Sequence, residues 1–268
     1  MQTKLEAPGT EPLSLKGTGV VLHDVARRYR ARRRGVTALE HFELEVHPRE
    51  VVAVVGPSGC GKSTLLELVA GLQEPDGGAV EAAGARTAAT RRAACAYMPQ
   101  RDLLLPWRDA LGNAALALEC QGVPRRAARR RAAPLFERFG LGEFEHAYPA
   151  DLSGGMRQRV AFLRTLLPGR PVLLLDEPFG ALDSITRGSM QQWLADALAE
   201  EPRTTVLVTH DVEEALFLAD RVAVLSPRPG RVLAELEVAL ERPRSRWTAV
   251  TDPGLAALKE RALEVLHA

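Results

Sequence analysis

The sequence predicts an α/β fold built on a mostly parallel sheet, because unbroken apolar runs alternate with helical patterns. The run VVAVV at 51–55 has the β-branched composition of a strand buried on both faces of a parallel sheet. Similar runs recur at 172–176, 204–210 and 221–226, and helical patterns such as 184–200 separate them. With right-handed crossovers, the carboxyl ends of these strands share one edge, where such sheets bind ligands.

Other regions of the chain differ from this core. Residues 1–19 are polar and contain Pro and Gly, so we expect a disordered leader. Residues 20–46 alternate as strands do, whereas residues 101–154 are rich in Ala, Leu and Arg at helical spacing. We therefore expect one domain over 20–240, with a helical subdomain at about 101–154 inserted in its α/β core, and a C-terminal appendage over 241–268.

The composition is that of a globular protein. Hydrophobic residues make up 46% of the 268 positions and the net charge is +1, which gives no reason to expect a polyanion partner for the chain as a whole. Cys60, Cys95 and Cys120 form no CxxC pair, which fits a reducing compartment and argues against disulfides or a zinc site. Neither a signal peptide nor an apolar run of about 20 residues is recognisable, so any membrane role is expected to be peripheral, through a partner.

A phosphate-binding loop follows the first buried strand. GPSGCGKST matches the pattern G-x-x-x-x-G-K-S/T in the required context of a strand before it and a helix after it. Its glycines let backbone N–H groups surround phosphate oxygens, Lys62 reaches the β- and γ-phosphates, and the Ser63 hydroxyl binds Mg²⁺. The alternative is a chance Gly-rich turn. The predicted ATP-binding residues here are Gly56, Pro57, Ser58, Gly59, Cys60, Gly61, Lys62, Ser63 and Thr64.

Cys60 within this loop has two interpretations. It is either a small residue that fills the loop or a reactive thiol beside a helix N-terminus. No acid–base partner is recognisable nearby, so the first interpretation is favoured.

Polar residues end two further strands and a short apolar run. Asp176 at the tip of VLLLD suits the Mg²⁺ shell, and Glu177 can polarise the attacking water, although adjacent carboxylates could instead cap a helix. His210 ends TTVLVT, where it could contact the γ-phosphate or hold the water, or simply be a structural residue. Gln100 after ACAYMP could be an ordinary turn residue.

The stretch DLSGGMRQRV at 151–160 reads as a second anion site. Ser153 precedes two glycines and a helical pattern, as expected of a capped helix start whose free N–H groups hold an anion. The chain already has a complete phosphate loop, so the identity of a second phosphate needs explaining.

In their order and spacing, GPSGCGKST, YMPQ, LSGGMRQR, VLLLDEPFGALD and VTHD resemble the nucleotide-binding subunit of an ATP-binding-cassette (ABC) transporter, over residues 20–235. The resemblance implies a P-loop NTPase (RecA-like) core with an N-terminal antiparallel β-subdomain, and an adenine-stacking aromatic for which Tyr29 matches by position. Tyr29 could also be a core residue. The implied cofactors are ATP and Mg²⁺; the implied catalytic residues are Glu177, His210 and Gln100, and the implied metal ligands are Ser63, Gln100 and Asp176.

The resemblance also assigns the second anion site to a dimer. Ser153, Gly154 and Gly155 would face the γ-phosphate bound by a second ATPase subunit, an identical copy or a close paralogue, in a head-to-tail pair. Asp183 in ALD would belong to the loop that links the two sites. The further partners implied are two transmembrane permease subunits and, indirectly, a periplasmic or lipoprotein substrate-binding protein. The chain would then lie peripherally on the cytoplasmic face of the inner membrane.

Two segments resemble one importer branch, which serves nitrate, sulfonates, taurine and thiamine precursors. These are LLLPWRDALGNAALALE at 103–119 and LADRVAVLSPRPGRV at 218–232. LLLPW could equally be apolar packing within the helical subdomain. The alternative class is a soluble ABC-type ATPase of DNA repair or translation, for which the Arg clusters at 27–34 and 125–131 are the one hint. These clusters lack interleaved aromatics beyond Tyr29, so no nucleic-acid partner is expected.

Overall fold

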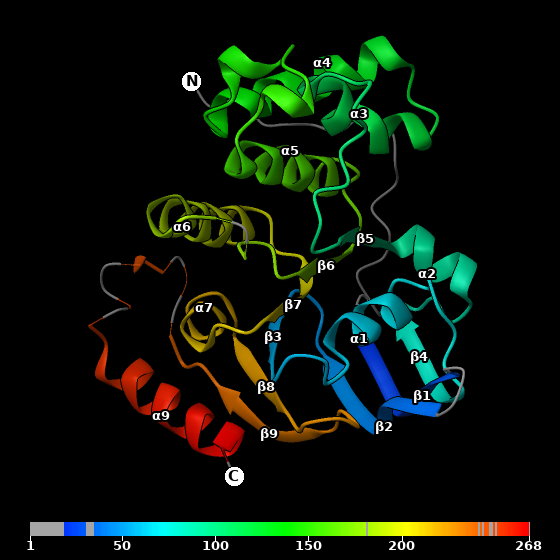
Figure 1. Cartoon of the computed structure of the whole chain (residues 1–268), viewed down its shortest axis with the longest axis vertical. Helices are drawn as coiled ribbons and strands as arrows, with labels where there is room; N and C mark the ends of the chain where they lie inside the picture. Colours follow the sequence, from blue (N-terminus) through cyan, green and yellow to red (C-terminus); the bar gives the residue numbers. More distant parts are fainter. Residues whose placement is uncertain are drawn as a thin grey trace.

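The computed structural model describes residues 19–30, 35–180, 182–240, 242, 244–246, 249 and 251–267. The predicted leader, except for its last residue, lies outside this part of the chain. Figure 1 shows the arrangement of the elements, which in chain order are β1 Val20–Arg30, β2 Gly35–Val46, β3 Val51–Val55, α1 Lys62–Val69, β4 Gly77–Ala82, α2 Ala88–Ala94, β5 Cys95–Met98, α3 Ala110–Cys120, α4 Arg125–Arg138, η1 Gly142–Phe144, η2 Pro149–Asp151, α5 Gly154–Leu166, β6 Val172–Asp176, α6 Ser184–Glu200, β7 Thr204–Thr209, α7 Val212–Leu218, β8 Arg221–Leu225, β9 Val232–Glu237 and α9 Pro253–His267.

The central sheet has the strand order β5-β6-β7-β3-β8-β9. All neighbours pair in parallel except β9, which runs antiparallel to β8 at the edge. The strands β3, β6 and β7 are buried along their whole length, which explains why their sequences are continuous apolar runs. This arrangement confirms the predicted α/β class and the mostly parallel sheet.

Each face of the central sheet packs against a different layer. Val52 and Val54 of β3 face a cluster that includes α1 and the strands β1, β2 and β4. Val51 and Val55 face the opposite cluster, to which helices α3 to α7 and α9 contribute. Since successive strand residues point to opposite faces, one short strand serves both cores.

The second sheet is three-stranded and antiparallel, in the order β2-β1-β4. It is the N-terminal antiparallel β-subdomain that the resemblance implied. Its strands β1 and β2 pair from Val20 opposite Val46 to Arg30 opposite Gly35, with register shifts on the way. The residue Tyr29 therefore lies on β1 near the end of the hairpin at which β1 connects to β2.

A helical segment separates β5 from β6, as Figure 1 shows at the top of the molecule. Its first helix, α3, is capped by Asp109, whose carboxylate accepts from the Gly112 N–H at 2.8 Å. The same carboxylate pairs with the Arg129 guanidinium of α4 through two contacts of 2.7 Å. The chain returns to the core through α5, which packs against α3 and β5.

The C-terminal helix α9 packs against α7, β8 and β9 and buries Leu255 and Ala262. Before it, the buried Arg244 guanidinium donates to carbonyls at the end of α7, including that of Ala219. Cations at a helix C-terminus satisfy carbonyls that the helix itself leaves free. Within the described part of the chain, no helix combines the length and the apolar character needed to cross a membrane.

Candidate functional site: a phosphate loop beside three strand ends

The phosphate loop runs from the end of β3 into α1, where the sequence placed it. Gly59 and Gly61 have φ values of 78° and 117°, a backbone region that residues with a Cβ rarely adopt. A Cβ on Gly61 would lie 2.8 Å from the Ala38 carbonyl oxygen of β2. Both glycines are therefore required by the backbone path, and Gly61 also by the close approach of the neighbouring strand.

Lys62 at the start of α1 is only 6% exposed, and its ammonium lies inside the loop. Its Nζ donates to the Gly56 carbonyl at 2.7 Å and to the Pro57 carbonyl at 3.1 Å. The charge is thus held inside the loop that is predicted to surround phosphate oxygens. Cys60 is 1% exposed and burial raises its thiol pKa, so the loop-filling interpretation agrees with the structure.

Arg228 contacts the outside of the same loop and was not identified from the sequence. Its Nε and Nη2 donate to the Gly59 carbonyl at 2.8 and 2.6 Å. The residue lies in the β8–β9 connection, within the segment SPRPG. An arginine in a proline- and glycine-rich turn after a core strand is the signal that could have drawn attention to it.

Asp176 at the end of β6 is buried beside the loop. Ser63 and the Tyr97 hydroxyl both bond its carboxylate, with Tyr97 at 3.4 Å. Burial raises the pKa of Asp176 despite these bonds, since a buried carboxylate loses hydration. Carboxylate and hydroxyl oxygens are the ligands that Mg²⁺ prefers. A cation bound here would stabilise the ionised form of the Asp176 carboxylate, which burial disfavours. Ser63 and Asp176 therefore fit the predicted metal site.

The carboxyl ends of three neighbouring strands bring together Glu177, Gln100 and His210. Gln100 Nε2 donates to Glu177 Oε2 at 2.9 Å, and His210 Nδ1 lies 3.5 Å from the same oxygen. These residues follow β6, β5 and β7 respectively, and those strands are neighbours in the sheet. The sequence predicted Gln100 as a metal ligand too; among the described hydrogen bonds it contacts Glu177 and not Ser63 or Asp176.

The backbone at Glu177 is unusual. Its φ is 46°, in the left-handed region, and its N–H donates to the Val208 carbonyl of β7 at 2.8 Å. Non-glycine residues in this region often mark functional sites, because the surrounding structure must hold them there. The turn directs the Glu177 carboxylate toward Gln100 and His210.

Tyr29 is half-buried and attached to the end of the phosphate loop. Its hydroxyl bonds Thr64 Oγ1 at 3.1 Å and Gln73 Oε1 at 3.0 Å. The Arg27 guanidinium lies 5.1 Å from the centre of its ring, within cation–π range. Two polar anchors thus fix a half-buried aromatic ring that is not part of the core, and its base-stacking role stays a prediction.

The segment predicted to be a second anion site forms the expected capped helix start. Ser153 Oγ accepts from the Met156 N–H at 3.2 Å, and α5 begins at Gly154 with Ser153 and Gly154 exposed. Asp183 likewise caps α6, and the Thr186 N–H lowers the pKa of its carboxyl. None of the described hydrogen bonds joins the start of α5 to the phosphate loop.

The arginine clusters are partly occupied within the described part of the chain. Arg27 pairs with Asp76, Arg28 lies within ion-pair range of Glu40, and Arg129 pairs with Asp109. The end of the first cluster, at 31–34, lies outside the described residues. These intramolecular pairs account for part of the local positive charge without a polyanion.

Comparisons with known proteins agree with this geometry. The ABC transporter family model matches residues 39–180. The aliphatic sulfonates import ATP-binding protein SsuB 1 of Rhodococcus jostii (strain RHA1) is 47% identical, covering 92% of this chain and 93% of its own length. The nitrate import ATP-binding protein NrtD of Synechococcus elongatus (strain ATCC 33912 / PCC 7942 / FACHB-805) is 40% identical, covering 93% and 92%.

A solved structure matches as well. The dimeric post-hydrolysis state of the ATP-binding cassette MJ0796, bound to ADP and Pi, has a TM-score of 0.75 at 31% identity and covers 83% of this chain and 100% of that one. The chain belongs to the ABC transporter family.

Proposed function

We propose that this chain is the ATP-hydrolysing subunit of an importer for a small solute such as nitrate, a sulfonate or taurine. The observation that carries the ATPase part is the meeting of Glu177, Gln100 and His210 beside a complete phosphate loop. The sulfonate and nitrate relatives support the import part.

The proposed mechanism assigns each residue of the site a role. Backbone N–H groups of 56–64 and Lys62 bind the phosphates, and the Tyr29 ring stacks on adenine. Ser63, Asp176 and Gln100 would hold Mg²⁺, which when bound neutralises charge on the β- and γ-phosphate oxygens. Glu177 takes the proton of the attacking water, while His210 contacts the γ-phosphate and orients that water.

The second half of each site comes from a partner subunit in this proposal. Ser153 and Gly154 are exposed and Gly155 is half-buried at a helix N-terminus, where an anion is favoured. A head-to-tail dimer, with either an identical copy or a paralogue, would bring them to the γ-phosphate of the other chain. Asp183, at the start of α6, would lie between the two sites.

The permease partners are proposed to contact the helical segment. Exposed apolar and aromatic side chains occur there, with Leu103 at 57%, Trp107 at 72% and Tyr148 at 50% exposure, whereas Leu104 packs against the core. The apolar packing that was the alternative interpretation of LLLPW thus applies to Leu104 and not to the exposed Leu103 and Trp107. The chain would lie at the cytoplasmic face of the membrane, and the substrate-binding protein would act through the permease.

The experiment that tests the function is co-purification with the membrane proteins encoded beside this chain, followed by transport of nitrate, taurine and an alkyl sulfonate in proteoliposomes. ATP-dependent uptake of one of them is expected. Stable binding to no permease would contradict the importer, even if ATP were hydrolysed. A nucleic-acid-stimulated ATPase without a permease would favour the repair or translation class instead.

A matched variant tests the dimer. Ser153→Arg places a long cation at the helix start and should abolish ATP-driven dimerisation, measured by light scattering. ATP binding should be unchanged, because it depends on the chain's own phosphate loop. Equal loss of both would mean that this helix serves its own site.

A further inference from the structure

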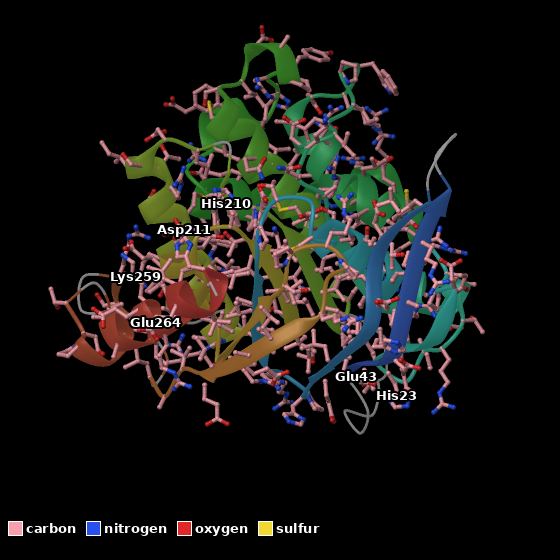
Figure 2. All side chains as sticks on the ribbon, turned by 60° about the horizontal axis from the view of Figure 1, so that its bottom comes forward. His23, Glu43, His210, Asp211, Lys259 and Glu264 are labelled. Atoms are coloured by element: carbon pink, nitrogen blue, oxygen red, sulfur yellow. The ribbon has the colours of Figure 1, made fainter. Side chains whose placement is uncertain are left out.

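Two buried polar side chains link the helices that follow Asp183 and His210. Gln191 on α6 is 1% exposed and Glu214 on α7 is 4% exposed. Asp183 is the N-cap of α6, and Asp211, next to His210, is the N-cap of α7. Figure 2 labels His210 and Asp211 at the turn between β7 and α7, and Lys259 on α9. A contact between Gln191 and Glu214 therefore connects two loops of the proposed ATP site.

The hydrogen bonds of this pair do not balance for an ionised glutamate. Gln191 Nε2 donates to Glu214 Oε2 at 3.0 Å, but Gln191 Oε1 and Glu214 Oε1 are both buried without a partner. Two buried acceptors without a donor are costly, and native proteins rarely leave them so. A proton on Glu214 Oε1 would supply the missing donor, since a carboxylic acid and an amide can form two parallel hydrogen bonds.

The surroundings of Glu214 favour its acid form below about pH 7. Burial raises its pKa to about 7, helped by the Asp211 carboxylate at its own helix N-cap. The hydrogen bond from Gln191, the nearby Thr209 hydroxyl of β7, which lies outside hydrogen-bond geometry, and the positive charge of Arg187 on α6 lower that pKa but do not restore the ordinary value of 4.5. On the α9 side, Lys259 pairs with the neighbouring Glu213.

Within the described part of the chain, the Arg187 guanidinium is the cation that acts on an ionised Glu214. That group donates from Nη2 to the Leu182 carbonyl at 3.0 Å, in the loop just before Asp183, and its Nε is buried without a partner. A Glu214 carboxylate would attract Arg187 and compete with this bond to Leu182. The protonation of Glu214 is thereby coupled to the loop that starts α6.

We propose that Glu214 is held as a neutral carboxylic acid that donates to the Gln191 amide oxygen, and that this pair is a positioning element that holds α7 and His210 in register with α6 and Asp183. The role in turnover rests on the ATPase function proposed above. The protonated pair itself does not, because it depends only on the packing of α6 against α7.

The first test detects the proton directly in the purified full-length chain. Infrared spectroscopy in D₂O should show a protonated-carboxyl C=O band at about pH 6. The band should be absent from Glu214→Gln and retained in Glu213→Gln, a control at the adjacent exposed position. A wild-type spectrum that lacks any band removed by Glu214→Gln would overturn the proposal, whether or not the chain hydrolyses ATP.

The second test separates positioning from simple support of the fold. Glu214→Gln keeps both hydrogen bonds, because its amide can donate to Gln191 Oε1, but it cannot ionise. Relative to this variant, the wild-type kcat for ATP should fall about tenfold between about pH 6 and about pH 8, as the neutral fraction of a group with a pKa near 7 does. The KM for ATP should not change, since the phosphate loop is not involved.

Glu214→Ala and Gln191→Leu provide the remaining outcomes. Both variants remove the pair and should lower kcat at every pH. Glu214→Gln keeps the pair and should not show this loss. If Glu214→Ala unfolds, the pH comparison between the wild type and Glu214→Gln still tests the positioning role. Parallel pH profiles of the wild type and Glu214→Gln would contradict the positioning role.

Discussion

Replacing Glu177 by glutamine removes a proton acceptor and little else. Glu177 Oε2 accepts from Gln100 Nε2 at 2.9 Å, and the amide oxygen of a glutamine can accept the same bond. Glutamine has nearly the same volume as glutamate, and the left-handed backbone at φ 46° strains both residues alike. The variant should therefore fold, bind ATP and retain the geometry around Gln100 and His210.

The expected loss in turnover follows from the role of a general base. Losing such a group costs about 10²–10⁴-fold in rate, or about 3–5 kcal/mol of transition-state stabilisation. The KM for ATP should stay close to that of the wild type, since Glu177 makes no contact with the phosphate loop among the described hydrogen bonds. ATP should accumulate in a dimer that cannot hydrolyse it.

The assay is phosphate release at saturating Mg²⁺ and ATP, together with light scattering of the ATP-bound protein. Glu200→Gln is the matched control, because Glu200 is exposed and pairs only with Arg138 among its described contacts. A Glu177→Gln turnover within about threefold of the wild type would refute the assignment of Glu177 as the base.

Three further variants probe the loop and the helical segment. Gly61→Ala should weaken ATP binding at least about tenfold, because the added Cβ would lie 2.8 Å from the Ala38 carbonyl oxygen and the φ of 117° is strained for alanine. Fluorescence titration measures the affinity, and an unaltered value would contradict this prediction. Asp109→Asn should cost about 2 kcal/mol in chemical denaturation at neutral pH, since the hydrogen bond from Arg129 lowers the Asp109 pKa from 3.8 to about 2. A lowered pKa stabilises the fold above 3.8 and the gain disappears as pH falls through about 2, so the difference between variant and wild type should disappear there. Arg228→Ala should raise the KM for ATP several-fold with little change in kcat, with partial recovery in Arg228→Lys, whereas an unchanged KM would exclude a role for its contact with the loop.

Local patterns carried most of the fold prediction. The runs at 51–55, 172–176 and 204–210 are apolar because both of their faces are covered. Such a strand can be recognised from its own sequence, without knowing which elements cover it. The phosphate loop is equally local, since two of its glycines are required by positive φ angles within the loop itself. Ser153 as a helix cap belongs to the same class of prediction.

Non-local contacts were beyond such patterns. Arg228 reaches Gly59 across 169 positions of sequence, and Tyr29 reaches Thr64 through a hairpin whose register no local pattern specifies. The Gln191–Glu214 pair was missed for another reason. Glutamine and glutamate at these positions look like ordinary exposed helix residues, and only the packing of α6 against α7 buries them.

The helical segment is attached to the core at two points that both carry proposed site residues. The chain enters it just after Gln100 and leaves it through α5, whose first turn follows Ser153. The strands on either side, β5 and β6, are paired neighbours and hold the two attachments to one rigid edge. A displacement of this segment would therefore act on the proposed site residues Gln100 and Ser153 together. The two attachments thus share one pair of hydrogen-bonded strands, so the proposed site residues beside them share one structural support.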